Sequence, residues 1–113
     1  MAGIGDPKMN ELKISPERPD KNLTVLKLSG EFEGLAILDS QERLFGYVKE
    51  EVGTDLMMDF AEIDYIDSAG IGVLLQMAKM ASQKNLKFGL LNVNDQVKKV
   101  LAVTKVDKIL KVY

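Results

Sequence analysis

Cysteine, histidine and tryptophan are all missing from this chain of 113 residues. Without cysteine there is neither a disulfide framework nor thiol chemistry. Without histidine the protein lacks the usual general base at neutral pH and the commonest metal ligand. We therefore expect no enzymatic activity, no catalytic residue, no metal site and no cofactor.

An excess of charge of either sign is also absent, because 15 Lys and Arg face 17 Asp and Glu for a formal net charge of -2. Nucleic-acid binding usually needs a clustered basic face, which this balance does not favour. No apolar run approaches the roughly 18 residues of a membrane-spanning helix. Residues 1–8 lack the apolar segment of a secretory signal. We expect a cytoplasmic protein that neither binds nucleic acid nor inserts into a membrane.

The remaining composition, 46% hydrophobic, suits one globular domain. Residues 1–9 are polar and show no periodicity, so we predict a disordered leader followed by a domain over residues 10–113. Residues 10–14 alternate as a short edge strand does, and residues 23–28 alternate as its hairpin partner. The segment between them, residues 15–22, holds two prolines and predicts a turn.

The rest of the chain alternates between helical and strand-like patterns. A helix is predicted from residue 35 to Val52 with Gly53 as its stop, then a central strand over 56–60. A second helix begins just after Ser68 and ends near Lys84, and a strand over 86–91 follows. Asn94 or Asp95 caps a third helix, and residues 109–113 form a last strand or a docked tail. The prediction is a single α/β domain with a mixed four- to five-stranded sheet, an N-terminal hairpin and packed helices.

The junction before the second helix carries the most informative motif, Asp67-Ser68-Ala69-Gly70-Ile71-Gly72. The hydroxyl of Ser68 can cap the helix, or it can be displayed to a partner that modifies it. The two roles are compatible, since a phosphate there would meet the positive end of the helix. A serine-hydrolase nucleophile is excluded, because Ile66 replaces the required glycine and no histidine exists.

Two further features surround this serine. Gly70 and Gly72 are poor helix formers, so each needs close packing against the sheet or close approach of a partner. The carboxylates that follow the third strand (Asp59, Glu62, Asp64 and Asp67) predict a solvated acidic rim. A phosphorylated-aspartate site is disfavoured, because no acidic pair follows the first strands.

On this motif and its place in the element order, the chain resembles STAS domains, named for sulfate transporters and anti-sigma factor antagonists. The fit runs over about residues 10–112 and is closest to the stand-alone antagonists of the SpoIIAA type. The resemblance implies that a serine kinase, which is itself the anti-sigma factor, phosphorylates Ser68. It also implies that the unphosphorylated protein binds this kinase and frees the sigma factor, and that phosphorylation ends the binding.

Further implied contacts with the partner come from Asp67, Ala69, Gly70, Ile71 and Gly72. Glu33 stands where the family usually has Asp, so its carboxylate reaches about one methylene further. Weak homodimerisation is a further option. An alternative stays open, in which the chain is a non-phosphorylated STAS subunit of a lipid-transport ATPase or another regulatory assembly, with Ser68 only a cap or a contact.

Overall fold

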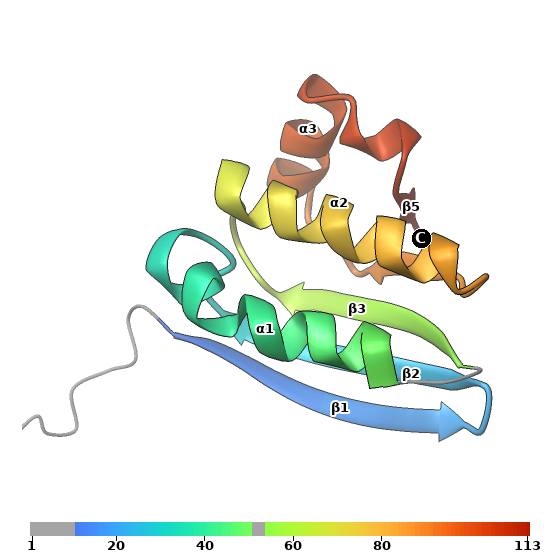
Figure 1. The fold of residues 1–113 in the computed structure, drawn as a ribbon. Helices are drawn as coiled ribbons and strands as arrows, with labels where there is room; N and C mark the ends of the chain where they lie inside the picture. Colours follow the sequence, from blue (N-terminus) through green and yellow to red (C-terminus); the bar gives the residue numbers. More distant parts are fainter. Residues whose placement is uncertain (1–10, 51–53) are drawn as a thin grey trace, which may run out of the picture.

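The computed structural model describes residues 11–50 and 54–113, and it shows one sheet with helices packed on it (Figure 1). The sheet order is β1-β2-β3-β4-β5, with β1 and β2 antiparallel and the other neighbours parallel. This confirms the predicted mixed α/β sheet with an N-terminal hairpin. The elements are β1 (Leu12–Asp20), β2 (Leu23–Gly30), α1 (Gly34–Glu50), β3 (Asp55–Glu62), α2 (Ser68–Gln83), β4 (Phe88–Leu91), α3 (Asp95–Val103), the 3-10 turn η1 (Val106–Lys108) and β5 (Lys111–Val112).

The first strand is longer than predicted. The sequence placed a turn over residues 15–22, but β1 continues to Asp20 and the turn is only Lys21 and Asn22. Pro16 and Pro19 were wrongly taken to end the strand. They are tolerated because β1 lies at the edge of the sheet, where a missing N–H breaks no ladder on the open side. The pairing is irregular between Glu17 and Asp20, beside the second proline.

The core lies between the sheet and two helices. Figure 1 shows α1 and α2 on the same face of the sheet, running in the same direction. Alternate residues of the central strands turn toward them, as the two-residue period of a strand requires. The largest of these side chains form one buried cluster with both helices: Leu26, Met58, Phe60, Ile37, Leu44, Leu74 and Met77.

A lysine joins the far ends of these two helices. The Lys84 ammonium, just past the end of α2, donates to the carbonyl of Val48 at 3.0 Å and to that of Lys49. The last carbonyls of a helix have no partner inside it and carry partial negative charge, so a cation is favourable there. This contact fixes α2 against α1 at the C-terminal ends.

The last elements of the domain are α3, η1 and β5. Asn94 caps α3, its Oδ1 accepting from the Val97 amide at 2.8 Å, which confirms one of the two predicted caps. The tail forms the short strand β5 beside β4. The predicted leader over residues 1–9 and the helix end at Val52 and Gly53 lie outside the described residues. None of the helices in the described ranges is both long and apolar enough to cross a membrane.

Candidate functional site

Ser68 is exposed and begins α2, but it is not the cap of that helix. The cap is Asp67, whose backbone is extended and whose Oδ1 accepts from the Gly70 amide at 3.0 Å. Of the two roles considered for Ser68, capping the helix is therefore wrong. Both residue types make good caps, and the preceding residue took the role. Within the described part of the chain, no hydrogen bond is made by the Ser68 hydroxyl.

Asp67 holds the starts of two helices together. Its second carboxylate oxygen, Oδ2, accepts from the Gly34 amide at 3.0 Å, at the first residue of α1. Both helices therefore present their positive ends to one carboxylate. Gly34 has φ +54°, in the left-handed region that favours glycine. The contact joins residues 33 positions apart and fixes the loop before α1 beside Ser68.

Phe32 and Gly70 form the second contact between the same segments. A Cβ at Gly70 would lie 2.5 Å from the Phe32 carbonyl oxygen and 2.8 Å from its ring. The absence of a side chain thus lets the first turn of α2 pack directly on the loop before α1. Phe32 also forms an isolated parallel bridge with Ile66, two residues before Ser68. The Phe32 ring also stacks at a tilt on Phe60, with centroids 5.0 Å apart.

Gly72 differs from Gly70. It is exposed, and a Cβ built on it would meet nothing within 4 Å. The expected tight packing therefore explains Gly70, where the neighbour is the Phe32 loop rather than the sheet, but it does not explain Gly72. A glycine in a helix costs about 1 kcal/mol relative to alanine. Nothing inside the described fold offsets that cost at Gly72.

The other predicted site residues gather around Ser68. Ala69 and Ile71 are half-buried and pack against the edge of the core, so each shows only part of its surface. Glu33 is half-buried on the loop before α1. Burial raises its pKa, and the neighbouring charges of Glu31 and Asp67 raise it further. The surroundings of Ser68 are therefore acidic, and they disfavour additional negative charge.

The remaining carboxylates of the predicted acidic rim lie in β3 and directly after it. Asp59 Oδ1 accepts from the Ala61 amide at 2.9 Å and from the Asn92 side chain at 3.0 Å. Glu62 and Asp64 are exposed. Among the described residues, no group of three or more His, Cys, Asp or Glu is arranged to hold a metal ion.

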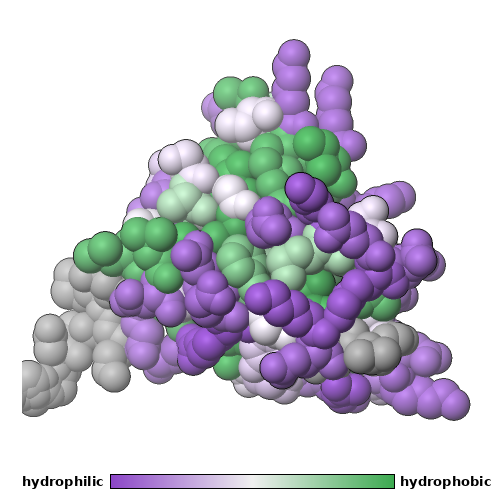
Figure 2. Space-filling view, viewed as in Figure 1, coloured by the Kyte–Doolittle hydropathy of each residue, from purple (hydrophilic) through white to green (hydrophobic). Residues whose placement is uncertain are grey.

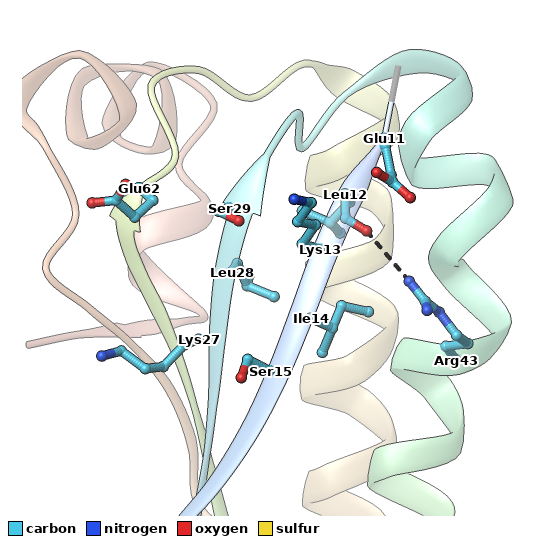
Figure 3. A pocket seen from close by; sticks show the side chains of 10 residues that line it. All are labelled: Glu11, Leu12, Lys13, Ile14, Ser15, Lys27, Leu28, Ser29, Arg43 and Glu62. Carbon is cyan, nitrogen blue, oxygen red and sulfur yellow. Dashed lines mark hydrogen bonds between the residues drawn. The ribbon is translucent and has the colours of Figure 1, made fainter. Parts of the chain in front are cut away.

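A separate cavity of about 580 Å³ lies beside the hairpin and does not include Ser68. In Figure 3, Lys27, Ser29, Ser15 and Glu62 project on one side of strands β1 and β2, and Arg43 approaches from α1 on the other. Its guanidinium donates to the Leu12 carbonyl at 3.3 Å. Two lysines, two glutamates and two serines line the cavity, and among the described residues no serine hydroxyl here is hydrogen-bonded to a carboxylate.

The sequence did not predict a role for Phe32, which contacts Gly70, or for Leu35 and Leu38, which follow Gly34 in the chain. The last two are exposed near the start of α1, 65% and 54% accessible. Their signal was present, because Leu35 and Leu38 fall outside the stripe of Ala36, Ile37 and Leu44 that faces the core. The stretch that contains Phe32 was expected beside the site from the resemblance, but its contact with Gly70 was not, because the two residues are far apart in the sequence.

The site is an exposed serine at the start of α2, beside the packed segment that leads into α1. The family model of the STAS domain matches residues 14–113, and the chain belongs to that family. A Thermotoga neapolitana protein named as a candidate anti-sigma factor antagonist is 31% identical over 58 residues, 51% of each chain. The match thus spans about half the length of this curated relative.

Solved structures share the fold over most of their length. An anti-sigma factor antagonist from Mycobacterium paratuberculosis superposes with a TM-score of 0.78 at 19% identity, covering 92% of this chain and 86% of that one. The Bacillus cell fate determinant SpoIIAA, in its phosphorylated form, gives a TM-score of 0.67 at 18% identity, covering 89% and 91%. At these identities the likeness concerns the fold.

Proposed function

We propose that this protein is a cytoplasmic anti-sigma factor antagonist that acts by partner switching. In its unphosphorylated form it binds a serine kinase that is also an anti-sigma factor, and phosphorylation of Ser68 ends the binding. It contributes no catalysis and needs no cofactor of its own. The observation that carries the proposal is the exposed Ser68 hydroxyl at the first position of α2, beside an independent cap.

Asp67 caps α2, whereas Ser68 is the residue that would receive the phosphate. This division favours a phosphorylation switch that leaves the fold intact. Asp67 satisfies the helix amide, so a phosphate on Ser68 replaces no structural hydrogen bond. The helix end attracts the phosphate, while Asp67, Glu33 and Glu31 repel it. A phosphoserine adds about -1.5 to -2 charges at pH 7, enough to change the potential of this small surface. A partner that fits the unmodified surface would then be rejected.

The same surface supplies the proposed docking residues. Gly72 leaves open space over the outer side of α2, where a partner backbone can approach closely. Ala69 and Ile71 offer partly exposed apolar surface on either side of buried Gly70. Glu33 and Asp67 add negative charge, which suits a partner with basic side chains.

The direct test uses the histidine-kinase-like serine ATPases encoded in the source genome, each purified and incubated with this protein and Mg-ATP. We expect one phosphate, mapped to Ser68 by mass spectrometry, and none on a Ser68→Ala variant. Ser82→Ala is the matched control, since Ser82 is exposed at the other end of the same helix. Labelling elsewhere, or undiminished labelling of Ser68→Ala, would refute the assignment.

A binding experiment separates the switch from the alternative. Titration calorimetry should show that Ser68→Asp weakens kinase binding, whereas Ser82→Asp leaves it unchanged. Absence of any kinase complex, together with stable co-purification with a lipid-transport ATPase, would instead favour the non-phosphorylated subunit.

A further inference from the structure

Two leucines project from the start of α1 into solvent. Leu35 is 65% exposed and Leu38 is 54% exposed. They lie three residues apart, so they share one side of the helix. The buried side is formed by other residues: Ala36, Ile37, Ser40, Leu44 and Val48. Within the described residues, Leu35 and Leu38 are therefore not part of the core, and we call them the leucine pair.

The leucine pair lies next to the proposed switch. Leu35 follows Gly34, whose amide donates to Asp67 directly before Ser68. Figure 2 shows apolar surface projecting on the left, at the place where α1 begins in Figure 1. Because Asp67 and the Phe32–Gly70 contact fix this loop on α2, the pair and Ser68 keep a constant spacing. A single rigid partner surface can therefore cover both.

The border of the pair is acidic. Residues 28–42 contain no lysine or arginine, whereas Glu31, Glu33, Asp39 and Glu42 all fall in this stretch. Asp39 and Glu42 are exposed on α1 beside the leucines. An interface with two-fold symmetry between copies would bring these acidic groups against each other, which is repulsive. The complementary surface is an apolar hollow rimmed by basic side chains.

We propose that the leucine pair inserts into such a hollow on the serine kinase, as an anchor separate from the phosphate switch. The inference rests on the proposed function and adds a second contact to it. A specific interface covers about 800 Å² on each partner, more than the Ser68 turn offers alone. The anchor supplies apolar burial, and Ser68 decides whether the charges beside it permit docking.

The test compares two double variants, each of which replaces two exposed apolar side chains. Leu35→Gln/Leu38→Gln alters the pair, and glutamine keeps good helix propensity. Val103→Gln/Ile109→Gln is the control, because these residues are 74% and 66% exposed on the C-terminal third. Leu35→Met/Leu38→Met retains apolar surface. Each is titrated, unphosphorylated, against the kinase that binds the wild-type protein, and urea unfolding verifies that folding is unchanged.

We expect Leu35→Gln/Leu38→Gln to raise the Kd for the kinase roughly tenfold to a hundredfold. The control variant should bind with unchanged Kd, and the Kd of the methionine variant should stay within about threefold of wild type. KM for Ser68 phosphorylation should rise while kcat stays near the wild-type value, since the reacting hydroxyl is untouched. Affinity should also fall as salt increases, because the rim is charged.

Unchanged Kd in the glutamine pair, with normal Ser68 phosphorylation, would overturn the anchor and leave the switch standing. Loss of self-association with unchanged kinase binding would assign the leucines to a second copy, which also overturns it. If the wild-type protein binds none of the genome's kinases and receives phosphate from none of them, the proposed function fails. The anchor then fails with it.

Discussion

The carboxylate of Asp67 is the clearest place to perturb this molecule, because it accepts from two amides at 3.0 Å each. Alanine removes both bonds. Loss of an N-cap costs about 1 kcal/mol, and loss of a hydrogen bond to a charged group costs about as much when the donor can be rehydrated. Gly34 is exposed, so its amide regains water. We expect Asp67→Ala to lower the free energy of unfolding by about 2 kcal/mol.

Asp67→Asn separates the two bonds. Asparagine caps a helix nearly as well as aspartate, but a carboxamide has one acceptor oxygen and can serve only one of the two amides. The expected loss is therefore about 1 kcal/mol, half that of alanine. Asp95→Asn is the matched control, because Asp95 lies in the first turn of α3 and its side chain makes no hydrogen bond within the described residues. The control should cost about 0.5 kcal/mol or less.

Urea unfolding at pH 7, compared at constant m value, measures these differences. Amide hydrogen exchange adds a local reading: Gly34 should exchange faster in Asp67→Ala, together with Gly70. If asparagine is as stable as wild type and alanine loses only a single cap, the contact between the two helices is energetically negligible. The account of a fixed Ser68 surface would then be wrong.

Two further predictions concern the same surface. Gly70→Ala should destabilise the fold by about 1–3 kcal/mol, because its methyl would clash with the backbone of Phe32. Gly72→Ala should instead stabilise the fold by up to about 1 kcal/mol, because alanine is the better helix former and has open space there. Thermal unfolding of the two variants tests both predictions, and equal effects would refute the distinction between the two glycines. Glu33→Gln should be more stable than wild type at pH 7 and similar near about pH 3.5. Burial and neighbouring charges raise the pKa of Glu33 in the folded protein. Protonated Glu33 therefore stabilises the fold at low pH, and this stabilisation is lost as the pH rises through the raised pKa. An equal difference in urea midpoint at both pH values would contradict this reasoning.

Local patterns carried much of the fold because they depend on near neighbours in the chain. A recurrence at three- to four-residue spacing through positions 37, 41, 44 and 48 predicted α1. Its apolar members Ile37, Leu44 and Val48 are buried. Asn94 was one of the two caps predicted for α3, and the amide it accepts from lies three residues away. The motif around Ser68 was visible for the same reason, as the junction between an apolar strand and a helix.

The errors arose where a distant segment decided the outcome. Pro16 and Pro19 predict a turn in any local reading, and only the edge position of β1 allows them inside a strand. Asp67 and Ser68 are equally suitable caps by residue type. The Gly34 amide, 33 residues away, is bound by Asp67, and nothing near the motif in sequence reveals that contact.

The sequence by itself determined the type and order of the elements and the serine at the helix start, because hydrophobic period and residue chemistry are local properties. Only the tertiary structure decided that Ser68 is exposed, that Asp67 bears the cap, and that Leu35 and Leu38 lie beside them. These depend on how two loops pack through Phe32 and Gly70. Packing between segments far apart in the chain is set by the whole core, so no local pattern encodes it.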